Sequence, residues 1–277
     1  MANDYVAQMF DVSGKVVAVT GGGGILCSVM AEALAKAGAA VAVLDLRRDA
    51  AAEVAGKITS QGGRAEAVSV DVLDRQSIEE AYKQVVDTLG PVDVLINGAG
   101  GNKKEATTSP DLSFFDLPES AVRWVFDLNC LGTIMPSQIF CRAMAARGQG
   151  NVINVSSMSA FHPLTKVLGY SGAKAAISNF TEWLAVHMAQ EYSPKIRVNA
   201  IAPGFFLTEQ NRFLLVDEKT GEPTTRGRAI IDSTPMARYG APEELLGLLF
   251  WLISGASSFV TGTVVAVDGG FNAFSGV

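Results

Sequence analysis

The chain has 277 residues, of which 48% are hydrophobic and 18% charged, and its formal net charge is −6. This length and apolar content suit one large α/β domain over 1–277, and the acidic balance argues against a nucleic-acid-binding protein, which needs a basic face. No apolar stretch is long enough to cross a bilayer, the first residues lack a secretory pattern, and the three cysteines form no CxxC pair or zinc-type spacing. We therefore expect a cytoplasmic protein with free thiols, no metal site and no membrane partner.

Short β-branched runs alternate along the chain with stretches of helical periodicity. The strands are expected at Val16–Val19, Val41–Leu44, Ala65–Val70, Val92–Ile96, Asn151–Val155, Ile196–Ile201 and Thr263–Val267. The helices are expected at Leu26–Ala37, Asp49–Ser60, Asp74–Leu89, Ala121–Ala146 with a break near Pro136, Tyr170–Glu191 and Pro242–Ile253. This alternation predicts a Rossmann-type, doubly wound parallel sheet of about seven strands flanked by helices. Ligands of such a sheet bind beyond the carboxyl ends of its strands.

Two long segments interrupt the alternation. Asn102–Glu119 is polar and follows the fourth expected strand, and 205–239 is rich in charge and follows the sixth. Loops of this length in a compact domain are commonly lids or binding loops. We therefore expect 205–239 to act as a substrate lid.

The first four strand ends carry residues suited to a nucleotide. A glycine-rich turn can bring backbone N–H groups against a pyrophosphate at a helix N-terminus, and an acid at the second strand end can bind the adenosine ribose. A tight turn without a ligand and a solvated carboxylate are the alternative interpretations. The residues expected to line the cofactor are Gly21, Gly23, Gly24, Ile25, Leu26, Asp45, Asp71, Val72, Asn97, Gly98 and Ala99. Because Asp45 would repel a 2′-phosphate, the pattern predicts NAD(H) rather than NADP(H).

Tyr170 and Lys174 lie four residues apart in an expected helix and therefore share one of its faces. A nearby ammonium lowers the pKa of a tyrosine from its usual value of about 10, so the pair can act as a general acid or base. Ser157 follows the fifth expected strand and can donate a hydrogen bond to a carbonyl oxygen at the same edge. Taken alone, a Tyr-x-x-x-Lys pair is more typical of a helix surface.

Tyr170-Ser171-Gly172-Ala173-Lys174, with Ser157 thirteen residues upstream, resembles the short-chain dehydrogenase/reductase family. Asn97-Gly98-Ala99-Gly100 is similar to the family's Asn-Asn-Ala-Gly element, and Val260–Gly270 is similar to its closing strand. The resemblance covers nearly the whole chain. It implies an NAD(H)-dependent oxidoreductase that interconverts a secondary alcohol and a ketone. A nucleotide-sensing protein that keeps the fold without turnover is the alternative of a different class.

The resemblance also implies roles for single residues. It adds Asn129 to Ser157, Tyr170 and Lys174 as the residue that completes a catalytic tetrad, and it makes Tyr170 and Lys174 cofactor contacts as well. It places Pro203, Gly204, Phe206 and Thr208 at the nicotinamide carboxamide.

The glycine-rich turn departs from the family's Thr-Gly-x-x-x-Gly-x-Gly pattern, because Ile25 and Cys27 occupy the last two glycine places. The turn is therefore expected to approach the pyrophosphate through Gly22, Gly23 and Gly24. Family members are commonly homotetramers. The apolar side chains of Phe180 and Trp183, on the helix after Tyr170, lead us to expect the same here.

The segments Phe205–Leu215 and Ser157–Lys166 resemble the sugar-acid branch of this family, the D-mannonate oxidoreductases or fructuronate reductases. A hexonate carries one carboxylate and several hydroxyls, and an arginine can grip a carboxylate with two hydrogen bonds. The residues expected to bind the substrate are Asn102, Ser159, His162, Gln210 and Arg212. We therefore expect interconversion of D-fructuronate and D-mannonate, with gluconate or another polyol as the alternative substrate. A solvated lid position is the alternative interpretation for each of these polar residues.

Overall fold

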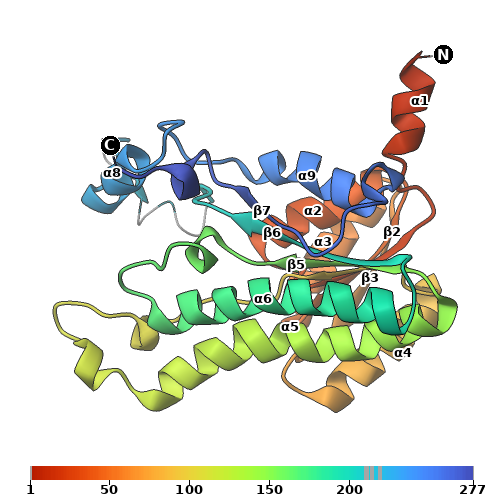
Figure 1. Cartoon of the computed structure of the whole chain (residues 1–277), viewed down its shortest axis with the longest axis horizontal. Helices are drawn as coiled ribbons and strands as arrows, with labels where there is room; N and C mark the ends of the chain where they lie inside the picture. Colours follow the sequence, from red (N-terminus) through yellow and green to blue (C-terminus); the bar gives the residue numbers. More distant parts are fainter. Residues whose placement is uncertain (1, 209–211, 213–214, 218–219, 277) are drawn as a thin grey trace.

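The computed structural model describes residues 2–208, 212, 215–217 and 220–276. Seven parallel strands form one sheet in the order β3-β2-β1-β4-β5-β6-β7 (Figure 1). They span β1 Val16–Thr20, β2 Ala40–Asp45, β3 Arg64–Ser69, β4 Val94–Asn97, β5 Gly150–Val155, β6 Ile196–Pro203 and β7 Val264–Val267. This confirms the predicted doubly wound sheet. The strand order reverses between β1 and β4, so a crevice for ligands is expected at their carboxyl ends.

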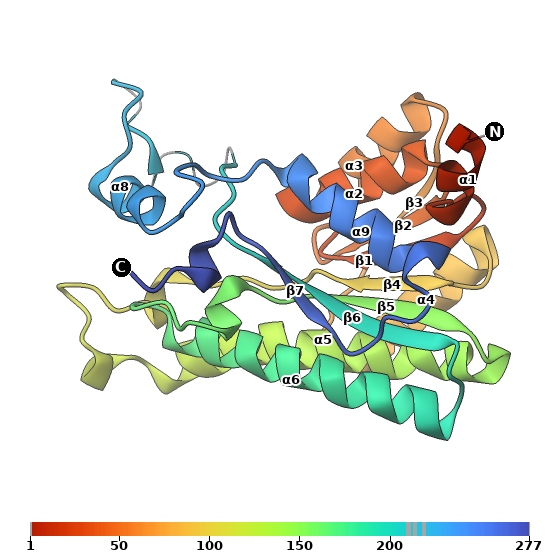
Figure 2. The ribbon, with the colours of Figure 1, turned by 45° about the horizontal axis from the view of Figure 1, so that its top comes forward.

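Helices cover both faces of the sheet (Figures 1 and 2). One face packs against α2 Ile25–Lys36, α3 Arg48–Ser60 and α9 Leu246–Ile253, and the other packs against α4 Arg75–Leu89, α5 Glu119–Arg147 and α6 Leu168–Glu191. All five residues of β1 are buried, as expected for a strand covered on both sides. The apolar runs in the sequence therefore correspond to the central strands.

Three features differ from the predicted elements. α5 continues through Pro136 without a break, because burial of Phe140 and Met144 in the core stabilises the helix beyond the backbone hydrogen bond that proline removes. The helix predicted at 242–253 begins as a 3₁₀ turn, η4 Pro242–Leu245, before α9. A short helix that we did not expect, α1 Ala2–Met9, projects from the body of the molecule (Figure 1). No helix in the described ranges is long and apolar enough to cross a membrane.

The segment 205–239 leaves the sheet after β6, and its two ends lie next to each other. Its two ends are joined by hydrogen bonds from Leu207 N to Gly240 O (3.0 Å) and from Gly240 N to Phe205 O (2.9 Å). Between them lies α8, Thr225–Asp232, which begins where the Thr224 side chain accepts a hydrogen bond from Gly227 N. The segment therefore contains secondary structure of its own, and its action as a lid stays a prediction.

Candidate active site

The glycine-rich turn lies directly against the end of β4. Gly21 has φ 65°, and a Cβ on it would lie 2.8 Å from Ala99 Cα. The Thr20 hydroxyl oxygen accepts hydrogen bonds from Gly98 N (3.1 Å) and Ala99 N (3.3 Å). α2 begins after Gly24, so its first turn, with Ile25 and Leu26, faces this edge with N–H groups that a helix cannot pair internally. The turn is thus shaped as an anion-binding helix start.

The Asp45 carboxylate at the end of β2 is held by two backbone donors. Oδ2 accepts from Gly23 N and Oδ1 accepts from Arg47 N, both at 3.0 Å. A side chain on Gly23 would meet Ala50 Cβ at 2.7 Å, so glycine is needed for this approach. Asp45 is therefore fixed beside the glycine-rich turn before any ligand binds.

Asp71 and Val72 follow β3, as predicted, but their side chains serve mainly the local structure. Asp71 Oδ1 accepts from Leu73 N (2.9 Å), and its own N–H donates to the Ser77 hydroxyl (2.9 Å). Val72 is buried and packs against Gly132 of α5. This loop is thus held by its own hydrogen bonds and by packing on α5.

Cys27 and Gly98 explain the departure from the family's glycine pattern. A Cβ on Gly98 would overlap Cys27 Sγ, so the thiol takes the space that a side chain at 98 would need. Burial raises the pKa of Cys27 to about 12, so the thiol stays neutral. The Cys27 side chain therefore fills the space beside Gly98 that a side chain on residue 98 would otherwise occupy.

α6 places Tyr170 and Lys174 on one face beside the start of the β5–α6 connection. Lys174 Nζ donates to Val155 O (2.8 Å) and lies 5.5 Å from the centroid of the Tyr170 ring. Ser157 is buried at the start of η3 Met158–Ala160, and its hydroxyl oxygen accepts from Ser159 N (3.2 Å). Tyr170 and Lys174 thus lie together because they are one helical turn apart, and Ser157 joins them because it follows β5.

Asn129 of α5 is brought close to Lys174. Its amide is fully buried, donates to Gly101 O and Val125 O (both 2.7 Å) and accepts from Gly101 N (3.1 Å). A Cβ on Gly100 would lie 2.6 Å from Asn129 Oδ1 and 3.4 Å from Lys174 Nζ, so both side chains approach this glycine. The four residues of the expected tetrad therefore lie together.

The pKa values correct one expectation. Burial raises the pKa of Tyr170, while its hydrogen bond with Ser157 acts in the opposite direction. The lowering that we expected from the Lys174 ammonium is wrong, because a buried site disfavours both charged forms. Burial lowers the pKa of Lys174 itself to about 8. Near neutral pH, Tyr170 is therefore a protonated acid beside an ammonium.

The predicted nicotinamide segment lies at the end of β6. Gly204 N donates to Val267 O (2.9 Å), and a Cβ on Gly204 would lie 2.6 Å from Asp268 Cα. Phe206 is buried, with its ring against Gly240. Pro203 is the last residue of β6, and Thr208 lies half-buried two residues beyond Phe206.

The predicted substrate residues fall into two groups. Ser159 and His162 lie on the turn that follows Ser157, and Ser159 is buried with no hydrogen-bond partner for its hydroxyl among the described residues. Asn102 instead donates to Thr107 Oγ1 (2.7 Å) within its own loop, and Arg212 is exposed. Gln210 lies outside the described residues.

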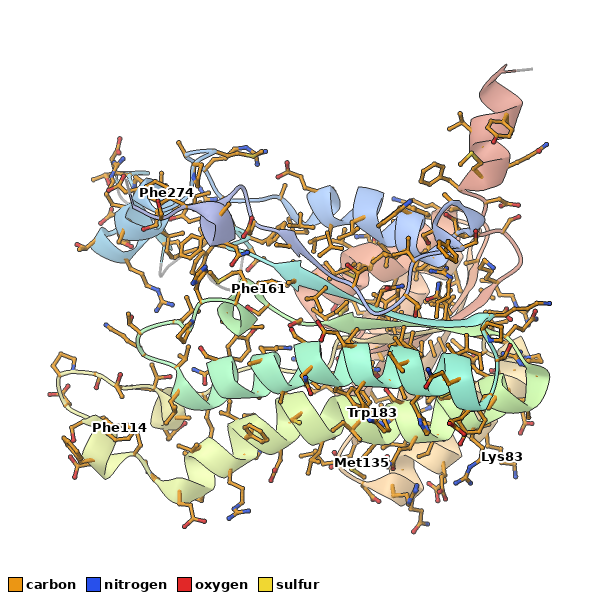
Figure 3. The ribbon with its side chains drawn as sticks, in the orientation of Figure 1. Lys83, Phe114, Met135, Phe161, Trp183 and Phe274 are labelled. Carbon is orange, nitrogen blue, oxygen red and sulfur yellow. The ribbon has the colours of Figure 1, made fainter. Side chains whose placement is uncertain are left out.

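The contact between His162 and Asn272 was not predicted from the sequence. The Asn272 carbonyl oxygen lies 3.1 Å from His162 Nε2, although the two residues are 110 positions apart. Figure 3 shows Phe161, beside His162, on the side of the molecule where Phe274 and the chain end lie. No local pattern marks Asn272, because only the direction of the chain after β7 brings it here.

Three comparisons place this geometry among known proteins. Residues 15–219 match the sequence profile of the family described as short chain dehydrogenase. The chain is 48% identical to an uncharacterized oxidoreductase UxuB of Bacillus subtilis, over 96% of this chain and 98% of that protein. It is 31% identical to the 5-keto-D-gluconate 5-reductase of Escherichia coli K12, over 95% and 97% of the two chains.

A solved structure from Haemophilus influenzae, provisionally named D-mannonate oxidoreductase and containing bound NAD, shares 47% of its sequence with this chain. The two superpose with a TM-score of 0.91 over 98% of this chain and 100% of the other. The family profile, these identities over almost whole chains and the seven-stranded sheet agree. The chain therefore belongs to the short-chain dehydrogenase family of oxidoreductases.

Proposed function

We propose that this protein is an NAD(H)-dependent dehydrogenase that interconverts D-mannonate and D-fructuronate. The observation that carries the reaction type is the clustering of Ser157, Tyr170, Lys174 and Asn129 beside the glycine-rich turn. The NAD in the Haemophilus structure and its provisional name support the cofactor and the substrate. The similarity to a 5-keto-D-gluconate 5-reductase supports gluconate chemistry as the second candidate.

Each residue of the cluster has a distinct task. Bound NADH supplies the hydride that reduces the ketone carbon. Tyr170 donates a proton to the carbonyl oxygen, and the Ser157 hydroxyl orients that oxygen. Lys174 returns a proton toward Tyr170, and Asn129, fixed by its three backbone hydrogen bonds, orders the path by which Lys174 exchanges protons with solvent.

Asp45 predicts the choice between the two nicotinamide cofactors. Its carboxylate would face a 2′-phosphate, and like charges about 4 Å apart repel by roughly 1 to 4 kcal/mol. We expect kcat/KM with NADH to exceed that with NADPH by roughly fivefold or more, and Asp45→Ser to reduce this preference. Asp49→Asn, an exposed charge nearby on α3, serves as control. Equal efficiency with both cofactors in the native protein would contradict the role of Asp45.

The substrate proposal is tested with a panel under saturating NADH. We expect D-fructuronate to give the highest kcat/KM, followed by 5-ketogluconate, with fructose and an apolar ketone much lower. Preference for fructose or for the apolar ketone would refute the sugar-acid assignment. If the protein binds NADH but does not oxidise it with any ketone of the panel, the nucleotide-sensing alternative is indicated instead.

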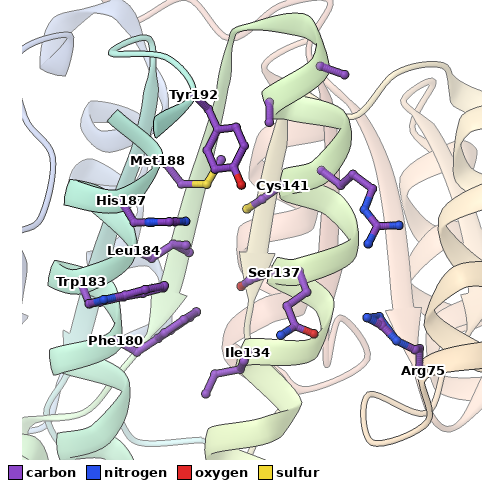
Figure 4. A pocket seen from close by; sticks show the side chains of 14 residues that line it. Arg75, Ile134, Ser137, Cys141, Phe180, Trp183, Leu184, His187, Met188 and Tyr192 are labelled. Carbon is purple, nitrogen blue, oxygen red and sulfur yellow. The ribbon is translucent and has the colours of Figure 1, made fainter. Parts of the chain in front are cut away.

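A hollow between α5 and α6 supports the proposal of a homotetramer (Figure 4). This cavity of about 850 Å³ is lined on α6 by apolar and aromatic side chains, among them Phe180, Leu184 and Met188, and its other lining residues include the charged Arg75 and Arg142. Trp183 stacks on His187 with ring centroids 4.8 Å apart, yet is 57% exposed. An apolar helix pair of this kind suits a symmetric contact with a second copy.

We expect light scattering at micromolar concentration to give a tetramer mass, and Trp183→Glu to give smaller species because it places a charge in the contact. Glu182→Gln, at the exposed residue before Trp183 in α6, should leave the mass unchanged. A monomeric native protein would rule the assembly out.

A further inference from the structure

Asn154 of β5 lies at the centre of a buried polar network between the sheet and the helices α5 and α6. Its Nδ2 donates to Thr181 Oγ1 of α6 (2.9 Å), and its Oδ1 accepts from Nδ2 of Asn97, its register partner on β4 (2.9 Å). Asn97 Nδ2 also donates to Ser137 Oγ of α5 (2.9 Å). All four residues are at most 1% exposed. One pair of amides therefore joins α5 to α6 across two adjacent strands.

Each of the two hydroxyls lies about two helical turns from a residue of the expected tetrad, on the same face of its helix. Ser137 follows Asn129 in α5, and Thr181 follows Lys174 in α6. On α5 the hydrogen bonds continue to the tetrad, since Ser137 Oγ donates to Thr133 O (2.8 Å) and Thr133 Oγ1 donates to Asn129 O (3.0 Å). A change in the separation of the helices at the amide pair would therefore move Asn129 relative to Lys174.

The strand β5 attaches to α6 at two levels. Near Lys174, the Ser156 hydroxyl donates to Lys174 O (3.3 Å) and lies 2.8 Å from the Ser178 hydroxyl. About one turn further along the helix, Asn154 holds Thr181. Two points of attachment restrain the direction of a helix as well as its distance, so the second bond limits the tilt of the helix that carries Lys174.

The network is not arranged for stability alone. Asn97 Oδ1 has no hydrogen-bond partner among the described residues, and an unpaired buried oxygen is a cost that apolar side chains would avoid. Hydrogen bonds, unlike apolar contacts, hold only over a narrow range of distance and angle. We propose that Asn154 is a positioning residue that, through its bonds to Thr181 and Asn97, sets α5 and α6 at the separation that ketone reduction needs. The inference rests on the proposed function, because it concerns the placement of the proton-transfer groups.

Thr181→Val is the sharpest test, because it nearly keeps the shape of the side chain and removes the hydroxyl that holds Asn154. We expect kcat for ketone reduction to fall about 10- to 100-fold, since a misplacement of about 1 Å can reduce a rate that far. NADH should still bind, because Asp45 and the glycine-rich turn lie outside the network. Thr181→Ser, which keeps the hydroxyl, should restore kcat.

The pH dependence supplies a second readout. A looser fit of α6 admits water to Lys174, so its pKa should rise from about 8 toward the ordinary lysine value, and the transition in kcat/KM should move to higher pH. Tyr170 and the Cys27 thiol also lie near Lys174, and burial raises the pKa of both, so they stay neutral and the transition reports Lys174. Thr181→Ser should keep the native transition.

Ser257→Ala is the matched control. Ser257 is also 1% exposed, but its hydroxyl donates to Leu252 O (3.1 Å) at the end of α9, on the other face of the sheet. We expect this variant to lose stability in urea, as Thr181→Val does, with native kcat and the native pH transition. Ser137→Ala tests the α5 side with a smaller truncation, which also serves if Thr181→Val does not fold, and its kcat should lie below that of Ser257→Ala.

Native kcat and a native pH transition in Thr181→Val would overturn the proposal, and so would an equal loss of kcat in Thr181→Ser. The pKa of Lys174 can also be followed by NMR of isotope-labelled lysine, assigned by comparison with Lys174→Met, and this readout needs no substrate. A native protein that reduces no ketone would therefore refute the proposed function, whereas an unchanged Lys174 pKa in Thr181→Val would refute the positioning role.

Discussion

Tyr170→Phe is expected to lower kcat for ketone reduction by about 10²- to 10⁴-fold, the usual contribution of a positioned acid or base. The substitution removes the phenolic proton and keeps the ring beside Lys174, so packing and NADH binding should survive. Burial holds the pKa of Tyr170 above its ordinary value, which keeps the proton on the phenol across the neutral range. Without it, the developing alkoxide loses its direct proton donor.

Stopped-flow or steady-state oxidation of NADH, with cofactor binding followed by fluorescence, would measure this effect. Tyr5→Phe, on the exposed helix α1, is the matched control and should behave as the native protein. Near-native turnover in Tyr170→Phe would refute the proposed proton donor, whatever the substrate.

Lys174→Met is expected to produce the second large loss, again of about 10²- to 10⁴-fold in kcat, and to remove a pH transition. Because burial lowers the pKa of Lys174 to about 8, the ammonium is present below that pH and lost above it. We therefore expect kcat/KM for ketone reduction in the native protein to fall as pH rises through about 8. Lys195→Met, an exposed lysine beyond α6, should keep both the rate and the transition.

The same pKa shift predicts how stability depends on pH. Between about 8 and the unfolded lysine value of about 10.4, the unfolded chain binds a proton at this residue that the folded chain does not. The contribution of Lys174 to the free energy of unfolding therefore rises with pH across this window, and lies lowest below pH 8. Urea unfolding of the native protein and of Lys174→Met at both ends of the window would show it. An identical pH slope in the two proteins would contradict the burial of the charge.

The sequence alone was sufficient for the sheet, because parallel strands buried on both faces leave continuous apolar runs such as Val16–Thr20. It also located the carboxyl-edge residues, since the residues that directly follow the strands of a parallel sheet lie at the same edge. Helical spacing placed Tyr170 and Lys174 on one face, and the family resemblance added Asn129 to the predicted tetrad. Local periodicity and local turn chemistry carry this information.

Tertiary packing decided the features that local sequence patterns could not show. Pro136 is tolerated because the core on both sides of it outweighs one lost hydrogen bond, and Gly98 is matched to the thiol of Cys27 across two elements. The direction of the Tyr170 pKa shift depends on burial, which spacing between two residues cannot reveal. Asn272 meets His162 only because β7 ends beside β6 and the chain then turns back over the site. Local patterns fix which elements form and which residues share a face, whereas contacts between distant segments, and the dielectric around each group, exist only once the chain has folded.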